Sequence, residues 1–309
     1  MRQNIIIGSR GSDLALYQAN FIKDILTDEL NCQVEIKIIV TSGDKIDNLS
    51  FDKMEGKGFF TKEIEDELLA GNIDVAVHSL KDLMTTQPEG LKLGAVGYRV
   101  DRREYLLINP EAYQEGSVIS IKDTKIIGTS SPRRKCQIAN HNPSLEIKDL
   151  RGNVPTRIRK LREGQYDAIV IAVAGVERLE LDLSGLKAVK LDAEQFLPAP
   201  AQGILGLQIR DNDERVENII QLMNDKKAAN EASLERGLLG KFDLGCSLPL
   251  GVYSEVTDDK FILKAILGVY DNNQWIGLKK TEVTGTDPKT MVEKAFTELN
   301  ESEPCHDSE

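Results

Sequence analysis

Short apolar, often β-branched runs alternate with amphipathic helical patterns through the first two-thirds of the chain. The runs are expected to be strands and the segments between them helices, such as one from Ser12 to Leu30 that Ser12 caps. Strands that alternate with helices predict an α/β fold with parallel sheets. The charged stretch from Tyr98 to Glu104 interrupts the series and predicts two separate sheets. The expected strands are NIIIG, VEIKIIVT, IDVAVHS, LKLGAV, KIIGTS, LEIKDL, YDAIVIAVAG and ILGLQI.

The last third of the chain, after about Asp211, has a different pattern. One long helical pattern, DERVENIIQLMNDKKAANEASLERGLLGKF, is followed by FILKAILGVYDNNQWIGLKKTEV, whose apolar residues alternate on both sides of the turn residues DNN. That alternation predicts an antiparallel hairpin, and a closing helix is expected from about Pro288 to Leu299. We therefore expect a small third domain of the α+β class.

Composition and charge narrow the class of protein. A chain of 309 residues, 40% of them hydrophobic, allows two or three domains at roughly 100 to 200 residues each. No apolar run approaches the roughly 18 residues of a membrane span, and the N-terminal run is too short for a signal peptide, so we expect a cytoplasmic protein without a membrane partner. The net charge of -11 argues against nucleic acid as a partner. The four cysteines have no CxxC spacing, so neither disulfides nor a metal site is expected.

Cationic residues follow five of the expected strands. Ligands of open α/β sheets bind beyond the carboxyl ends of the strands, where helix N-termini also point. Arginine suits carboxylates and phosphates, because its planar group donates two parallel hydrogen bonds. For any one of these residues a solvated surface charge is an equally good interpretation, but five together predict a site for a ligand with several negative charges. The residues are Arg10, Lys81, Arg133 with Arg134, Arg151 with Arg157, and Arg178, several of them beside Ser12, Thr129, Ser130 or Ser131.

Asp82, in the stretch VAVHSLKD, is a lone acid expected at this cationic edge. A carboxylate there can act as a general acid or base, or stabilise a cation that develops on the substrate. An N-terminal helix cap or an ion pair with Lys81 explains the residue equally well. The neighbouring His78 has no second ligand nearby, so a structural hydrogen bond is the better interpretation.

Two other features remain open from the residues alone. Cys246 lies in the Gly-flanked loop DLGCSLPLG and is the best candidate for covalent chemistry, although a buried thiol is the more common case; Cys32 and Cys136 lie in or beside helical patterns, where a free cysteine is usually a small core residue. Lys53 and Lys57, in DKMEGKGFF, are either a basic lid over the anion site or simple loop charges.

A series of motifs resembles the hydroxymethylbilane synthase family, also called porphobilinogen deaminase. In order, the motifs are GSRGSDLALYQA, GKGFFTKEIEDELL, DVAVHSLKDL, GTSSPRRKCQ, DLRGNVPTRIRKL, YDAIVIAVAGVERL, LPAPAQGILGLQIR and LGCSLPLG. The matches run in this order from Ile5 to Gly251, which is most of the chain. The resemblance implies a transferase of porphyrin and haem biosynthesis that condenses four porphobilinogen molecules head to tail into hydroxymethylbilane and releases ammonia. It also implies two domains similar to type II periplasmic binding proteins, followed by the small C-terminal domain.

The resemblance implies a role for each candidate residue. Asp82 matches the catalytic aspartate, and Cys246 the cysteine that carries a dipyrromethane cofactor through a thioether. Cofactor contacts are implied for Ser79, Lys81, Asp82, Thr129, Ser131, Arg133 and Arg134. Substrate contacts are implied for Arg10, Ser12, Arg151, Arg157, Arg178 and Gln202. Lys53 and Lys57 match a flexible loop over the cleft.

The chain departs from the family pattern at a few positions. Asp13 and Met84 stand where proline is usual, so the turn after Asp82 is expected to be less rigid, and Asp243 and Leu244 alter the approach to Cys246. None of these changes removes a charged or nucleophilic position of the motifs.

The expected domains are 1–98 with 202–219, 104–196 and 224–309, in a monomer. The alternative from another class is a non-catalytic cytoplasmic protein that binds or senses a small polyanion on the same two-lobed fold. Such a protein has no use for Asp82 or for a thiol that carries a cofactor.

Overall fold

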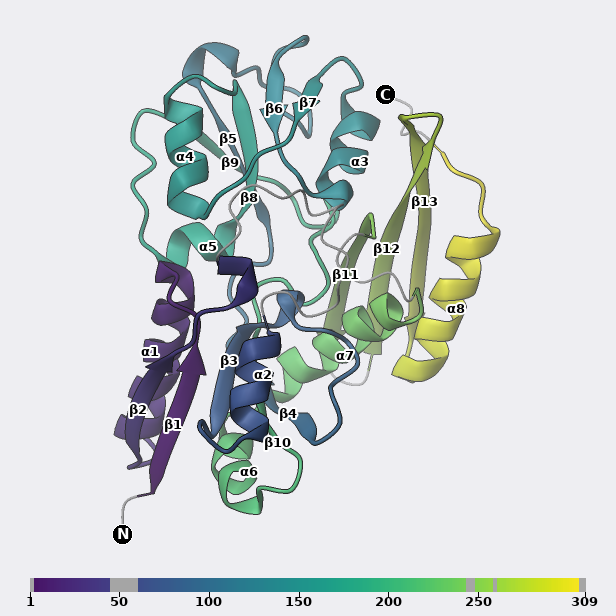
Figure 1. The fold of residues 1–309 in the computed structure, drawn as a ribbon. Coiled ribbons are helices and arrows are strands. Elements are labelled where there is room, and N and C mark those ends of the chain that lie inside the picture. Colours follow the sequence, from purple (N-terminus) through teal and green to yellow (C-terminus); the bar gives the residue numbers. More distant parts are fainter. Residues whose placement is uncertain (1–2, 45–60, 243–247, 258–259, 306–309) are drawn as a thin grey trace. The chain divides into compact units, whose positions relative to one another are not determined.

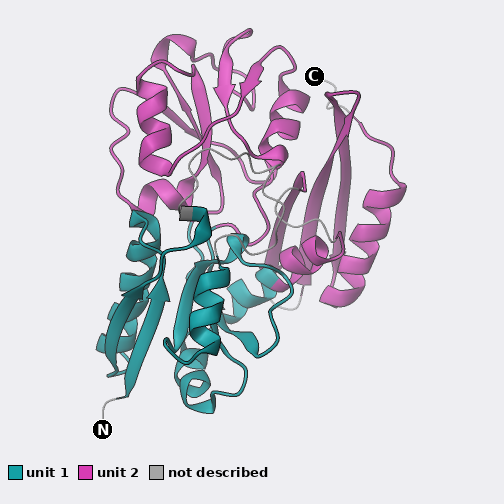
Figure 2. Cartoon of the chain, in the orientation of Figure 1, with its two compact units in different colours: residues 1–100, 203–232 teal, residues 101–202, 233–309 magenta. Residues whose placement is uncertain are grey.

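The computed structural model describes residues 3–44, 61–242, 248–257 and 260–305 (Figure 1). Two compact units divide the chain: one contains residues 1–100 and 203–232, the other residues 101–202 and 233–309 (Figure 2). The second unit holds both the second α/β sheet and the C-terminal sheet. The three-domain boundaries expected from the sequence therefore stay a prediction.

The first unit is built on a five-stranded sheet of order β2-β1-β3-β10-β4. Strand β1 pairs in parallel with β2 and β3, whereas β10 runs antiparallel to both β3 and β4. Helices α1 and α6 pack on one face of the sheet and α2 on the other. The strands are β1 (Asn4–Ser9), β2 (Gln33–Ile38), β3 (Val75–Ser79), β4 (Leu91–Gly97) and β10 (Leu205–Arg210), and the helices are α1 (Asp13–Asp28), α2 (Lys62–Leu69) and α6 (Glu214–Ile220).

Helix α1 begins where the sequence predicts. The hydroxyl of Ser12 accepts a hydrogen bond from the backbone N–H of Ala15, which satisfies one of the N–H groups that a helix start leaves unpaired. The helix packs through Ala19, Ile22 and Leu26, which are fully buried against the sheet.

The second unit contains a sheet with the same arrangement, in the order β7-β6-β8-β5-β9. Strands β7, β6 and β8 are parallel, and β5 runs antiparallel between β8 and β9. Helix α3 packs on one face, and α4 and α5 on the other. The strands are β5 (Glu104–Ile108), β6 (Ile126–Gly128), β7 (Glu146–Lys148), β8 (Ala168–Ala172) and β9 (Lys187–Lys190), and the helices are α3 (Pro132–His141), α4 (Val154–Arg162) and α5 (Val173–Arg178).

The two sheets confirm the expected α/β class and correct the expectation that they are purely parallel. In each sheet the antiparallel strand follows directly where the chain passes from one unit to the other: β5 follows residue 101 and β10 follows residue 203. A strand that enters from the other unit is not joined by a crossover helix, so it is free to run antiparallel. Strands β5 and β9 were not predicted.

The C-terminal part is a three-stranded antiparallel sheet covered by helices, which confirms the small α+β part. The predicted hairpin is β12 with β13, and Asn272 and Asn273 at its turn have the positive φ angles of 47° and 62° that this tight turn requires. Leu234 and Leu238 of α7 and Met291 of α8 pack on the sheet. The elements are α7 (Lys226–Gly240), β11 (Leu250–Thr257), β12 (Lys260–Asp271), β13 (Gln274–Gly285) and α8 (Pro288–Glu301).

The single long helix predicted before this sheet is wrong. Helix α6 is followed by a 3₁₀ turn and a break at Asn224, after which α7 starts. The side chain of Asn224 accepts a hydrogen bond from the backbone N–H of Val96, and Asp225 accepts bonds from the N–H groups of Lys227 and Ala228. These contacts favour a cap over a continuous helix. Within the described residues, 3₁₀ turns lie at Ser42–Asp44, Leu80–Asp82, Pro110–Ala112 and Gln221–Met223.

No helix within the described ranges combines the length and the apolar character that crossing a bilayer requires.

Candidate active site

Asp82 lies at the end of a 3₁₀ turn that directly follows the buried strand β3. Leu80 and Leu83 on either side of it are buried, and the backbone N–H of Leu80 donates to the carbonyl of Ile204 at 3.0 Å. These apolar anchors leave the side chain of Asp82 exposed. The residue that precedes the turn is Ser79, so Asp82 is not its N-cap. The cap alternative for Asp82 therefore loses its support.

Arg10 and Ser12 lie at the same edge of the sheet as Ser79 and Asp82. Strands β1 and β3 are parallel, with Gly8 aligned on Ala76, so the residues that follow both strands leave the sheet on one side. Arg10 and Lys81 are half-buried. The hydroxyl of Ser79 accepts a hydrogen bond of 2.8 Å from Nε2 of Gln18 on α1.

His78 is a structural residue, as predicted. It is buried on β3, and its Nε2 lies 3.1 Å from Oε1 of Gln208 on β10. Burial lowers the pKa of His78 to about 4, because a charged imidazole would lose its hydration there. His78 is therefore neutral at pH 7.

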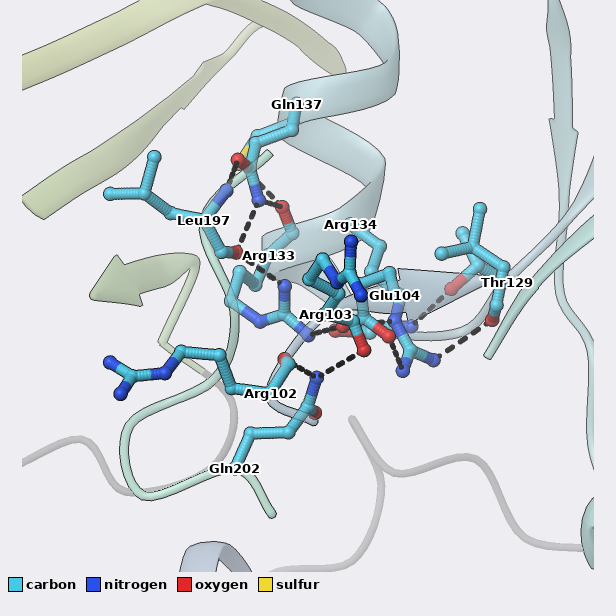
Figure 3. Close-up of polar contacts among 12 residues, drawn as sticks. Arg102, Arg103, Glu104, Thr129, Arg133, Arg134, Gln137, Leu197 and Gln202 are labelled. Atoms are coloured by element: carbon cyan, nitrogen blue, oxygen red, sulfur yellow. Dashed lines mark hydrogen bonds and ion pairs between the residues drawn. The ribbon is translucent and has the colours of Figure 1, made fainter. Parts of the chain in front are cut away.

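Arg133 and Arg134 share one buried carboxylate, that of Glu104 on strand β5 (Figure 3). Nη2 of Arg133 lies 2.5 Å from Oε1 of Glu104, and Arg134 reaches Oε1 through Nε and Oε2 through Nη2, at 3.1 and 2.8 Å. The carbonyls of Leu197 and Val170 accept further bonds from the two guanidinium groups, at 2.7 and 3.0 Å. Both arginines sit in the first turn of α3 and are held from several sides.

This cluster carries two cations against one anion in a buried setting. Burial lowers the pKa of Arg133, and the Coulombic attraction of Glu104 opposes that shift. The start of α3 adds backbone N–H groups, and Ser131, its N-cap, makes no capping bond with its side chain. Thr129 is buried, and its hydroxyl accepts from the N–H of Ser131 at 3.3 Å. Excess positive charge, N–H donors and hydroxyl groups together fit a ligand that presents carboxylates.

Arg151 and Arg157 flank the start of α4. Asn153 caps the helix by accepting from the N–H of Thr156 at 3.0 Å, and Nε of Arg157 donates to the carbonyl of Gly152 at 2.7 Å. Gly152 has a φ of 108°, a conformation that a side chain disfavours. This tight loop sets the positions of both arginines.

The strand ends of the second sheet meet at one edge. Strand β6 is parallel to β7 and β8, so the residues that follow these strands leave the sheet on the same side. The hydroxyl of Ser130 joins two of these segments, because it donates to the carbonyl of Leu150 and accepts from the N–H of Leu150, both at 3.0 Å. Arg178 is buried at the last position of α5.

Gln202 is fully buried, and its Nε2 donates to the carbonyl of Arg102 at 2.8 Å. Its predicted contact with substrate stays a prediction. Cys246, Lys53 and Lys57, together with Asp243 and Leu244, lie outside the described residues, so the roles predicted for them also stay predictions.

The described cysteines separate into two kinds. Cys32 and Cys136 are free and buried, which confirms that they are small core residues, whereas Cys305 is free and exposed. Burial raises the pKa of Cys136 to about 12 and also raises that of Cys32. Neither buried thiol is therefore suited to covalent chemistry at neutral pH.

Glu104 is the site residue that sequence reasoning missed. A signal was present: it is the only acid in EYLLI, a run that is otherwise apolar, and an acid at the head of a buried strand requires a cationic partner. The run is hard to recognise from the sequence, because a charged stretch lies directly before it.

Two family models match nearly the whole chain. The model described as "Porphobilinogen deaminase, dipyromethane cofactor binding domain" matches residues 5–218, and "Porphobilinogen deaminase, C-terminal domain" matches residues 229–301. The chain belongs to the porphobilinogen deaminase family. The first model spans Asp82 and all the arginines that follow the strands of the two α/β sheets. The family assignment and the resemblance of the motifs therefore agree.

Curated porphobilinogen deaminases from several bacteria support the assignment over most of the chain. The one from Sulfurimonas denitrificans is 41% identical over 90% of this chain and 88% of its own length. The one from Fusobacterium nucleatum is 44% identical over 86% and 88%, and the one from a Nitratiruptor species is 39% identical over 96% and 92%.

Several solved structures with a lower similarity are solute-binding proteins. An ancestral arginine-binding protein is 16% identical, with a TM-score of 0.41 over 79% of this chain and 100% of its own. An ancestral cationic amino acid solute-binding protein is 15% identical, with a TM-score of 0.44 over 71% and 87%. At these values the likeness adds nothing to the porphobilinogen deaminase assignment.

Proposed function

We propose that the chain is a hydroxymethylbilane synthase that joins four porphobilinogen molecules head to tail and releases ammonia, with Asp82 as its catalytic carboxylate. The match of the cofactor-binding domain over residues 5–218 is the observation that carries the proposal. The cationic cluster of Arg133 and Arg134 around Glu104 lies within that match. Each porphobilinogen carries an acetate and a propionate, so the growing chain is the polycarboxylate that such a site favours.

We propose that a dipyrromethane is bound through a thioether to Cys246. The raised pKa values of Cys32 and Cys136 support the choice of this cysteine, because they leave both buried thiols protonated. When bound, the dipyrromethane supplies the pyrrole carbon to which the first substrate is joined. The residues that would hold it are Ser79, Lys81, Asp82, Thr129, Ser131, Arg133 and Arg134.

We assign the substrate carboxylates to the remaining residues at the two strand-end edges, Arg10, Ser12, Arg151, Arg157, Arg178 and Gln202. Asp82 is exposed on a turn that buried leucines anchor, which suits a side chain that must reach a bound substrate from a fixed backbone. Its carboxylate would stabilise the positive charge that develops as ammonia leaves the substrate.

We also propose that the protein acts in porphyrin biosynthesis as a cytoplasmic monomer with the three domains predicted from its sequence. Molecular mass in solution, measured by light scattering, tests the monomer. Limited proteolysis followed by mass spectrometry tests the domain boundaries.

The intact mass of the purified protein tests the cofactor, and porphobilinogen turnover tests the activity. We expect a mass gain equal to two pyrrole units, which is lost in Cys246→Ser and kept in the matched control Cys305→Ser. Release of ammonia and formation of hydroxymethylbilane should likewise be lost in Cys246→Ser and kept in Cys305→Ser. An unmodified mass in active protein would refute the role of Cys246, whereas binding of porphobilinogen without turnover would favour the non-catalytic polyanion-binding protein.

A further inference from the structure

A chain of buried and part-buried side-chain hydrogen bonds runs from strand β3 to the segment that follows Asp82. It starts at His78, whose Nε2 lies 3.1 Å from Oε1 of Gln208. Nε2 of Gln208 donates to Oε1 of Gln87 at 2.9 Å and to Oε1 of Glu65 at 3.2 Å. Nε2 of Gln87 then donates to the backbone carbonyl of Met84 at 2.7 Å. The chain of bonds ends two residues beyond Asp82.

The direction of every bond in this chain follows from Glu65. A carboxylate oxygen accepts, so the amide nitrogen of Gln208 must face it. The second hydrogen of that nitrogen goes to the oxygen of Gln87, which turns the nitrogen of Gln87 toward the carbonyl of Met84. The oxygen of Gln208 is left for His78, which therefore donates from Nε2. A flip of the Gln87 amide would break two of these bonds, and a flip of the Gln208 amide would break three.

The chain of bonds is anchored in the sheet and in helix α2 of the first unit. Gln208 is fully buried on β10, His78 is 7% exposed on β3, and Glu65 is 8% exposed on α2. Strands β3 and β10 are hydrogen-bonded neighbours, with His78 opposite Gly206. The position of Gln87 is therefore set by the sheet and by α2.

The backbone around Asp82 is fixed on one side by the sheet and on the other by Gln87. Before Asp82, the turn is tied to β10 through the bond from Leu80 to Ile204. After Asp82, Leu83 is buried, and Met84 places no covalent restraint on its own φ angle, unlike a proline. The hydrogen bond from Gln87 to the carbonyl of Met84 supplies a restraint at that point.

We infer that Gln87 and Gln208 are positioning residues for Asp82, which hold the exit of its turn so that the carboxylate keeps one position relative to the substrate. This inference rests on the proposed role of Asp82. A displacement of a reacting group by about 1 Å can cost up to about 100-fold in rate, so the loss of one restraint is expected to cost about tenfold.

The test compares the holoenzyme with Gln87→Met, which keeps the length of the side chain and removes both bonds. We expect kcat for porphobilinogen to fall about tenfold, with KM, melting temperature and cofactor content close to wild type. Gln221→Met is the matched control, because Gln221 is exposed on a 3₁₀ turn and its Nε2 donates to Glu217 alone. Its kcat should match wild type.

Rescue separates positioning from a general structural role. Leu83 has φ -87° and ψ 135°, the extended conformation that a following proline requires, so Met84→Pro can restrain the same turn without Gln87. We expect the double variant Gln87→Met with Met84→Pro to recover most of the lost kcat. An unchanged kcat in Gln87→Met, or a loss that proline does not restore, would overturn the inference.

If Gln87→Met alone does not accumulate as folded protein, Met84→Pro serves as the parent. The inference then requires that adding Gln87→Met to this parent change kcat by less than twofold, and a tenfold loss there overturns it. Turnover by the wild-type protein tests the proposed function, whereas only the ratio of variant to parent tests the positioning role.

Discussion

The guanidinium of Arg134 binds both carboxylate oxygens of Glu104, with Nε 3.1 Å from Oε1 and Nη2 2.8 Å from Oε2. Oε1 also pairs with Arg133, and the side chain of Glu104 has no solvent exposure. In such a buried cluster the desolvation of each charge is offset only by its partners, so the removal of the shared anion leaves two cations buried side by side.

Glu104→Gln should therefore lower the free energy of unfolding by about 3 kcal/mol, in the range found when one partner of a buried ion pair is removed. Urea denaturation followed by circular dichroism measures it. Glu163→Gln is the matched control, since Glu163 pairs with Arg159 on the exposed face of α4 at 3.1 Å and such pairs contribute under about 0.5 kcal/mol. Equal stability of the two variants would show that Glu104 does not hold the arginines.

The cationic edges could be predicted from the sequence because of one rule of sheet geometry. Residues after parallel strands leave a sheet on the same side, so Arg133, Arg134 and Arg151 could be grouped without knowing the strand order. Their partner could not be found in this way, because Glu104 begins a strand that runs in the opposite direction. The rule applies to residues after the carboxyl end of a strand, and Glu104 lies at the amino end of its strand.

Other errors arose where tertiary contacts outweigh local pattern. The helix break at Asn224 depends on a bond to Val96, a residue far away in the sequence, and the local capping bonds of Asp225 leave no mark in the apolar pattern. The edge strand β9, KAVK, is short and half polar, so its apolar pattern is too weak to identify it. The hydrogen bonds that lead to Met84 could not be predicted either, because Gln87 and Gln208 are far apart in the sequence and only the fold brings their side chains into contact.

The two kinds of cysteine should differ in their reaction with iodoacetamide at pH 8. With a pKa of about 12 and 1% exposure, Cys136 has a thiolate fraction of about one in ten thousand and little access to reagent. Cys305 is exposed and should be alkylated readily. Peptide mass spectrometry after timed labelling measures both rates in the same sample, and unfolding in urea should make Cys136 reactive. Equal rates in the folded protein would contradict the burial of Cys136.

The neutral state of His78 predicts a dependence of stability on pH. Its folded-state pKa is about 4 and its ordinary value is 6.5, so between these pH values the unfolded chain binds a proton that the folded chain does not. Stability is therefore fully present above pH 6.5 and is lost as the pH falls toward 4, by at most about 3 kcal/mol.

The measurement is the free energy of unfolding from pH 4 to pH 8 for the wild type and for His78→Gln, whose Nε2 can take the place of the imidazole Nε2 as the donor to Gln208. Carboxylates that titrate near pH 4 are common to both proteins and cancel in the difference. The difference in the free energy of unfolding between the two proteins should be constant above pH 6.5. Below that pH the wild type should lose stability relative to His78→Gln. Parallel curves over the whole range would show that His78 gains its proton as readily in the folded state.

Two glycines at opposite ends of α4 provide a matched pair for backbone strain. Gly152, before the helix, has φ 108°, and a Cβ placed there would lie 2.7 Å from Cγ2 of Thr156. Gly164, after the helix, has φ 74° and no atom within 4 Å of that position. Gly164→Ala should therefore cost about 1 kcal/mol, from backbone strain alone, and Gly152→Ala about 3 kcal/mol, from strain and the clash.

Gly152→Ala should in addition raise KM for porphobilinogen several-fold, because the loop it belongs to sets Arg151 and Arg157, whereas Gly164→Ala should leave KM unchanged. Thermal unfolding and steady-state kinetics on both variants give the comparison. A KM that rises equally in the two would mean that the arginines respond to loss of stability and not to the shape of the loop.

The role of Asp82 is tested by Asp82→Asn, which keeps the size of the side chain and removes its charge. Asp82 is exposed and its turn is held by Leu80 and Leu83, so the free energy of unfolding should change by less than about 0.5 kcal/mol. Loss of a group that stabilises charge in the transition state typically costs about 100- to 1000-fold in kcat, and that loss is expected here. Asp66→Asn, at an exposed position on α2 that pairs with Lys62 at 2.9 Å, is the control and should keep wild-type kcat. A variant at position 82 that retains most of its ammonia release would make Asp82 a surface residue of the turn, and the catalytic carboxylate would have to be sought elsewhere in the chain.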